Sequence, residues 1–286
     1  MTQDDVVTLL RELSASGARE LQLKVPARPL LREGGRLLPT QHAAMTPEAM
    51  HRFATHLLTI ARIEIPLGQV RHREFSFGVH KLGRFHATIY RQRGTLAISI
   101  AKLALPIPTL EDLGLDTSIE SVFDQNGLVL ICGTRERAAA MACLIDRYNA
   151  AHRGLVIVVE DPMTYLHRDG TAIIAQRDVG TDVDNMAAGV CGAVRQGADV
   201  IAAGHVKDRA TAESVLRAAE EECLVLACVS APDASLAASW LLRHYDSDRD
   251  MDVKARVKRV LRGVLCVPEE GAARYVTRRP SLRKAS

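Results

Sequence analysis

No segment of the 286-residue chain has the ~18 consecutive apolar residues that a membrane-spanning helix requires. The N-terminal segment MTQDDVVTLLREL is acidic and amphipathic, whereas a secretory signal peptide has a basic flank and a long apolar core. These two absences predict a protein without a secretory signal peptide and without a membrane span.

Most of the chain also lacks long stretches of charge of one sign. The formal net charge is +3, which by itself argues neither for nor against nucleic acid, and we expect no nucleic-acid partner. Only the last segment, RYVTRRPSLRKAS, is locally basic. It is typical of a solvated end, with contact to an anionic partner as the alternative.

The cysteines include no CxxC pair, the spacing of many zinc and redox sites. All six lie in or beside apolar segments, which predicts buried thiols in a reducing compartment and therefore a cytoplasmic protein. We expect no metal site, and a zinc site is the alternative. They are Cys132, Cys143, Cys191, Cys223, Cys228 and Cys266.

Residues 1–108 have the pattern of a small α+β domain. Apolar positions at helical spacing predict a helix over residues 4–15, and ELQLKV then alternates as a half-buried strand does. Thr46 followed by Pro47 predicts the start of a second helix. The segments EFSFGVH and RFHATIYRQ, joined by KLG, predict a hairpin, with LAISIAKL as the next strand.

Residues 109–286 have a different rhythm. Short, wholly apolar segments such as GLVLICG, GLVIVVED, ADVIAAG and CLVLACVS alternate with helical patterns. Strands of this kind are buried on both faces, so the alternation predicts a parallel sheet built from βαβ units. Ligands of such α/β folds bind beyond the carboxyl ends of the strands.

The first of these strand ends, GTRERAAAM from Gly133, stands where a phosphate-binding loop would lie. A working loop, GxxxxGK[ST], needs a second glycine, a lysine and a hydroxyl for Mg²⁺. The lysine and the closing hydroxyl are absent here. Arg135 and Arg137 could attract an anion at the helix N-terminus, and the alternative is an ordinary turn with solvated charges.

Three further strand ends carry polar residues. Glu160 and Asp161 place two carboxylates at the edge of the sheet, where they could orient water or hold a metal. His205 follows the next strand, and imidazole is a poor ligand for Mg²⁺, so we expect a surface or hydrogen-bonded histidine. Ser230 and Asp233 have no histidine beside them in the sequence, which predicts no nucleophile with its base.

These strand ends, in this order, resemble the PilT/PilU family of type IV pilus retraction ATPases, within the type II/IV secretion ATPase superfamily. The likeness runs from about Ala18 to about Val267 and includes GRFHATIYRQRG, LEDLGL, VVEDPMTYLH, AQRDV, ADVIAAGHVKDRAT and VLRGVL. It implies a PAS-like N-terminal α+β domain and a RecA-like α/β domain of the P-loop type. It also implies ATP and Mg²⁺ as ligands and a hexameric ring.

The resemblance also implies roles for particular residues. Glu160 and Asp161 match the acidic box of the family, in which a glutamate activates water. Arg84 and Arg93 match arginines that reach a nucleotide on a neighbouring domain, and Arg177 matches the arginine of a QRE motif.

Other matches fall at the nucleotide site itself. Gly133, Thr134, Arg135 and Arg137 occupy the phosphate-loop positions, but the loop is about two residues shorter than in the family and lacks its signature.

The remaining departures also concern hydrolysis. His205 stands where the family has a Walker B glutamate, and Ser230 stands where it has the histidine of its His box. We also expect the C-terminal helical portion of the family to be missing or replaced by the basic segment.

These departures predict a degenerate phosphate loop in a PilT-like protein that hydrolyses no ATP and needs no cofactor. Such a protein would act by binding a PilT-like motor paralogue or the pilus or secretion platform, in a homo- or hetero-hexamer. Two alternatives remain open. One is a divergent ATPase that uses Arg135 or Arg137 in place of the lysine, and the other is a sensor that binds nucleotide without turnover.

Overall fold

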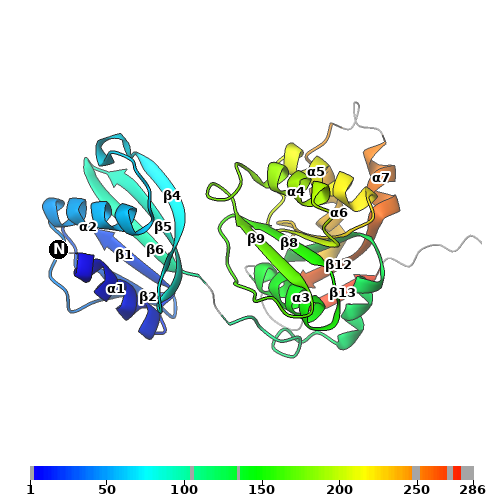
Figure 1. Cartoon of the computed structure of the whole chain (residues 1–286), viewed down its shortest axis with the longest axis horizontal. Coiled ribbons are helices and arrows are strands. Elements are labelled where there is room, and N and C mark those ends of the chain that lie inside the picture. The colour runs from blue at the N-terminus through cyan, green and yellow to red at the C-terminus, as the bar shows by residue number, and fades with distance from the viewer. Residues whose placement is uncertain (1–2, 104–105, 134–135, 247–251, 269–272, 278–286) are drawn as a thin grey trace, which may run out of the picture. The chain divides into compact units, whose positions relative to one another are not determined.

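The computed structural model describes residues 3–103, 106–133, 136–246, 252–268 and 273–277. It divides into two compact units, Met1–Leu105 and Pro106–Ser286 (Figure 1). The predicted α/β fold class is confirmed, with an antiparallel sheet in the first unit and a mostly parallel one in the second. No helix of the described residues is both long and apolar enough to cross a bilayer.

The first unit packs two helices on one face of a six-stranded antiparallel sheet of order β3-β2-β1-β6-β5-β4 (Figure 1). Its elements are α1 (Gln3–Ala15), β1 (Glu20–Lys24), β2 (Leu30–Glu33), β3 (Arg36–Pro39), α2 (Pro47–Ile60), η1 (Leu67–Gln69), β4 (His72–Val79), β5 (Gly83–Gln92) and β6 (Thr95–Lys102).

The local sequence explains the boundaries of these elements. The Thr46 hydroxyl accepts a hydrogen bond from the Ala49 amide at 3.1 Å, so α2 begins where the capping residues predict. Strands β5 and β6 are joined by Arg93 and Gly94, with φ angles of 48° and 80°. Positive φ at both central residues is typical of a tight hairpin turn.

The second unit has a seven-stranded sheet of order β13-β12-β7-β11-β10-β8-β9. Helices α4 to α7 cover one face, and α3 with η2 covers the other (Figure 1). Its elements are η2 (Thr117–Asp124), β7 (Gly127–Gly133), α3 (Arg137–Ala151), β8 (Leu155–Glu160), β9 (Ile173–Asp178), α4 (Met186–Arg195), β10 (Val200–Ala203), α5 (Arg209–Glu220), β11 (Leu224–Cys228), α6 (Ala234–Leu242), α7 (Val253–Val260), β12 (Leu261–Val267) and β13 (Arg274–Thr277).

Both edges of this sheet differ from the sequence expectation. Strand β9 pairs in parallel with β8, although its sequence IIAQRD is not wholly apolar. A strand at the edge of a sheet is less buried than a central strand and can carry polar residues. Ile173, the first residue of β9, is accordingly 63% exposed. At the other edge β13 runs antiparallel to β12, which in turn pairs with β7.

The expectation of six buried cysteines is correct for four and wrong for two. Cys132, Cys143, Cys223 and Cys228 are buried, whereas Cys191 and Cys266 are half-buried, and all six are free thiols. The difference arises because β12 and α4 each keep one side partly open to solvent.

Candidate functional site

The carboxyl ends of four neighbouring parallel strands, β7, β11, β10 and β8, meet at one edge of the second unit. The sequence assigns to this edge the turn after Gly133, the Ser230 segment, His205 and the Glu160–Asp161 pair. Since the strands are in register, these groups form a row across the sheet. This row is the candidate site.

Gly133, the last residue of β7, is held closely against its neighbours. Gly133 has a φ of 102°, and its amide donates to the Ala231 carbonyl at 2.8 Å. A Cβ atom added at Gly133 would lie 2.0 Å from the Val267 carbonyl oxygen. Glycine is therefore required here by the packing of β7 against β12. Thr134 and Arg135 lie outside the described residues.

Arg137 is the first residue of α3, and its side chain turns back on the chain. Its Nη1 donates to the Gly133 carbonyl at 3.3 Å. Glu136, at the N-cap, makes no side-chain capping bond. The guanidinium thus contacts the backbone of the turn at the position where a phosphate-loop lysine would serve a ligand.

Glu160 is almost fully buried at the end of β8, and this burial raises the pKa of its carboxyl group to about 7. The Thr164 amide donates to it at 3.1 Å and partly offsets that effect, and nearby Asp178 raises the pKa further. Asp178 is also buried, and it accepts a hydrogen bond from the Met163 amide at 3.0 Å. The two carboxylates therefore hold the segment that follows β8.

Asp161 differs from its neighbour, because its side chain points to solvent. Its Oδ2 lies 3.0 Å from Nζ of Lys207, and both side chains are well exposed. The sequence brought Glu160 and Asp161 to one place on the sheet, but their chemistry differs: one is a buried acid and the other a surface ion-pair partner.

His205 and Ser230 form a direct hydrogen bond, which corrects the sequence expectation. Nε2 of His205 lies 2.6 Å from the Ser230 hydroxyl, because β10 and β11 are neighbouring strands. No histidine lies beside Ser230 in the sequence, because 25 residues separate the pair, but the expectation that Ser230 has no base near it was wrong. Spacing alone could not have found it. Asp233 instead caps α6 by accepting from the Ser235 and Leu236 amides.

The surroundings keep His205 neutral. Burial lowers the pKa of its imidazole to about 4, and the positive charges of Arg137, Lys207 and Arg243 lower it further, with Asp161 acting in the opposite direction. A neutral imidazole can accept the Ser230 hydroxyl proton at Nε2.

The three arginines expected from the resemblance lie elsewhere. Arg177, on β9, donates to the Gln196 side chain. Arg84 is half-buried on β5, and Arg93 is exposed in the β5–β6 turn, both in the first unit. The reach of Arg84 and Arg93 toward a nucleotide stays a prediction, and so does the match of Arg177 to the QRE arginine.

Among the described residues at this edge, the side chains and backbone amides do not fit a triphosphate with bound Mg²⁺. Mg²⁺ prefers carboxylate, hydroxyl and water oxygens, but the β10 end presents an imidazole already bonded to Ser230. The Gly133 amide is already used by Ala231. Among the described residues, no group of three or more His, Cys, Asp and Glu side chains is placed to hold a metal ion.

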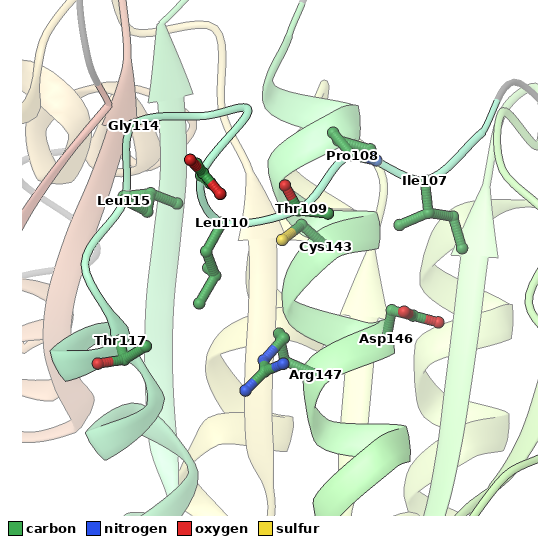
Figure 2. A pocket seen from close by; sticks show the side chains of 11 residues that line it. Ile107, Pro108, Thr109, Leu110, Gly114, Leu115, Thr117, Cys143, Asp146 and Arg147 are labelled. Atoms are coloured by element: carbon green, nitrogen blue, oxygen red, sulfur yellow. The ribbon is translucent and has the colours of Figure 1, made fainter.

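A separate cavity of about 550 Å³ lies along α3, starting about two helical turns beyond its N-terminus (Figure 2). Cys143, Asp146 and Arg147 face it from α3, and residues 107–117 form its other wall (Figure 2). Nε of Arg147 donates to Glu120 at 2.6 Å, and burial raises the pKa of the Cys143 thiol to about 11. The residues that line this cavity are all different from those of the strand-end row.

No family model matches the sequence. Among curated proteins, the chain is 26% identical to the type IV pilus ATPase PilU of Pseudomonas aeruginosa over 273 residues, covering 93% of this chain and 71% of that protein. It is 22% identical to the pilus retraction ATPase PilT of the same organism, covering 91% and 76%.

Among solved structures, the pilus retraction motor PilT with bound ADP superposes with a TM-score of 0.83 at 25% identity, covering 99% of this chain and 85% of that one. These likenesses in sequence and fold support a PilT-like type II/IV secretion ATPase family for the chain. They agree with the order of strand-end segments in the sequence. The resemblance is therefore confirmed.

Proposed function

We propose that the chain is a PilT-like accessory or regulatory subunit of a type IV pilus or type II secretion motor that acts by binding rather than by ATP hydrolysis. Similarity to PilT and PilU supports a function related to type IV pilus motors. The further step, to a subunit without hydrolysis, rests on the strand-end row.

The single observation that carries this proposal is the His205–Ser230 hydrogen bond at the β10 and β11 ends. It fills, with a neutral pair, the place where the resemblance implies a Walker B carboxylate and a catalytic histidine. The β7 turn has no lysine between Gly133 and Arg137 in the sequence. The groups that would neutralise a triphosphate are thus replaced on two neighbouring parts of the edge.

Rate estimates support the same conclusion. Phosphoryl transfer is catalysed mostly by positioning and charge stabilisation, and one such group contributes on the order of 10²–10³ in rate. The combined replacement of lysine, Mg²⁺ hydroxyl and Walker B acid would lower the rate to background. Glu160, which has a pKa of about 7, could accept a proton from water, but only beside an aligned phosphate.

The proposed partner is a PilT-like motor or the platform it works on, in a homo- or hetero-hexamer. Arg93 suits a contact between subunits, because it is exposed in the β5–β6 turn of the first unit. Its positive φ fixes the direction of the turn.

A mixing experiment tests the proposal. Purified chain is added to a PilT-type motor, complex formation is followed by native mass spectrometry, and phosphate release by the motor is measured. We expect mixed complexes and a changed motor rate, both weakened by Arg93→Ala. Arg36→Ala, another exposed arginine of the first unit, is the matched control and should have no effect. Absence of mixed complexes, or equal effects of both variants, contradicts the proposal.

A divergent ATPase is the second candidate, favoured by Arg137 at the turn and by the retained Glu160. Isothermal titration with a non-hydrolysable ATP analogue and Mg²⁺ addresses it. This candidate predicts binding heat that is lost in the Arg135→Ala/Arg137→Ala double variant. The absence of heat in the unmodified chain eliminates it.

A further inference from the structure

Two cysteines lie opposite each other at the end of β7. The register of the parallel pair β7 and β12 sets Cys132 against Cys266 and Gly133 against Val267. Cys132 belongs to the core under α4 to α7, and Cys266 packs against that same core, so both thiols lie on one face of the sheet. Cys266 is close enough to Cys132 to raise the pKa of the Cys132 thiol, and its own Sγ lies 4.0 Å from the Pro232 carbonyl oxygen.

This arrangement suits a disulfide. Opposed residues on neighbouring strands lie about 4.8 Å apart, which is inside the Cα separation of roughly 4.4–6.8 Å found across disulfides. Because the two Cβ atoms leave the sheet on the same face, they stay about as far apart as the strands. A local closing of the strands by about 0.5 Å brings them within the roughly 3.5–4.5 Å found between Cβ atoms across disulfides.

We propose that Cys132 and Cys266 are a modification site, at which a hydroperoxide oxidises the two thiols to a reversible disulfide that fastens β7 to β12. The site lies one residue before the turn at Gly133. The proposed oxidation does not depend on whether the chain hydrolyses ATP.

The order of the two steps follows from exposure. Cys266 is half-buried and reachable, whereas Cys132 is fully buried. Burial, with a contribution from Cys266, raises the pKa of the Cys132 thiol to about 12, so Cys132 is not the first to react.

The Cys266 sulfur attacks the peroxide O–O bond and becomes a sulfenic acid, and the alcohol ROH leaves with the thiol proton. The Cys132 sulfur then displaces the sulfenic hydroxyl, the S–S bond forms, and the Cys132 proton leaves with that hydroxyl as water. Two thiols are oxidised and one hydroperoxide is reduced.

Among the described residues, the pairing is selective. Cys228 lies near Cys132 but faces α3, where its Sγ contacts the Arg137 carbonyl oxygen and the Met141 sulfur, each at 3.8 Å. Cys191 lies on α4 and is half-buried, as Cys266 is. It therefore serves as a control for exposure without a partner in register.

The test uses the full reduced chain. After brief exposure to hydrogen peroxide and blocking of free thiols, we expect the intact mass to fall by about 2 Da and peptide mapping to link Cys132 to Cys266. Dithiothreitol should reverse both changes. The oxidised chain should also melt several degrees higher, because the crosslink closes a long chain segment.

Variants make the assignment specific. Cys132→Ala and Cys266→Ala should each abolish the linkage, and Cys191→Ala should leave it unchanged. Cys266→Ala alters a half-buried side chain, so it keeps the test valid if Cys132→Ala does not fold. Phenylarsine oxide, which bridges paired thiols, should bind the reduced chain one to one and fail on either single variant. A linkage through another cysteine, or oxidation of Cys266 to sulfinic acid with Cys132 still free, overturns the proposal.

Discussion

The two ends of the strand-end row are built in opposite ways. At the β8–β9 end, Glu160 and Asp178 are buried acids that accept hydrogen bonds from the segment that follows β8. At the β10–β11 end, His205 and Ser230 bond to each other and present a neutral pair. The first end presents buried acidic groups, and the second presents an imidazole bonded to a hydroxyl.

This difference teaches that the two ends of one row can support the surrounding chain to different extents. The acids of the β8–β9 end also support local backbone, so their removal carries a cost in stability. At the β10–β11 end, the side chains of His205 and Ser230 bond to each other and support less of the backbone.

Gly133→Ala should have the largest effect. The added Cβ would lie 2.0 Å from the Val267 carbonyl oxygen at a φ of 102°, so we expect a loss of about 4 kcal/mol in the free energy of unfolding. Urea denaturation followed by circular dichroism measures it. Gly180→Ala, beyond β9, has a similar φ of 83° but open space, and should lose only about 1 kcal/mol. Equal losses would contradict the close packing of β7 and β12.

The pH dependence of stability should separate the two ends. Glu160 has a folded pKa of about 7, above its ordinary 4.5, so its contribution is present below pH 4.5 and is lost as pH rises to about 7. His205 has a folded pKa of about 4, below 6.5, so its contribution is present above pH 6.5 and is lost as pH falls to about 4. The two slopes therefore oppose each other between these limits.

Single variants separate the two contributions to the pH dependence of stability. Glu160→Gln should leave a stability that rises with pH from about 4 to 6.5, and should be more stable than the unmodified chain at pH 8 by on the order of 2 kcal/mol. His205→Gln should leave a stability that falls as pH rises from 4.5 to 7. Thermal melts at half-unit pH intervals measure both. Parallel profiles for the two variants would refute the assignment.

Removal of one hydrogen-bonding side chain should lower the free energy of unfolding more at the β8–β9 end than at the β10–β11 end. Asp178→Ala leaves the buried Met163 amide without its 3.0 Å partner, so we expect a loss of about 2 kcal/mol. Ser230→Ala should lose about 1 kcal/mol or less, because Ser230 is half-buried and water can replace it. Denaturant midpoints for the two variants give the comparison. The reverse order would mean that the His205–Ser230 pair is the main support of this edge.

The exposed ion pair should matter least. Asp161→Asn removes the charge that faces Lys207 at 3.0 Å, and both side chains are well exposed, so we expect a change within about 0.5 kcal/mol. Repeating the melt in 1 M salt provides the control, since screening should remove what difference there is. A loss above about 1 kcal/mol would show that Asp161 is part of the buried acid cluster.

Much of the fold could be predicted from the sequence, because its strongest patterns are local. Thr46 and Pro47 marked the start of α2, and the apolar run at Leu128 marked β7. Strand β9 was missed because an edge strand can keep polar residues such as Arg177, which blur the apolar pattern.

The site was less predictable than the fold. Glu160 and Asp161 were found by their place after a strand, but their different burial depends on packing by Gly204, whose added Cβ would lie 2.9 Å from Glu160 Cγ. The His205–Ser230 bond depends on which strands are neighbours. Sheet order is a long-range property that spacing in the sequence does not carry.

Phosphate release by the purified chain with ATP and Mg²⁺ is the decisive assay for a subunit that does not hydrolyse ATP. We expect a rate equal to background and equal to that of Glu160→Gln, measured at the same concentration and pH. A rate well above background that falls in Glu160→Gln would contradict it, because the acid at the β8 end would then be acting on a bound and aligned phosphate.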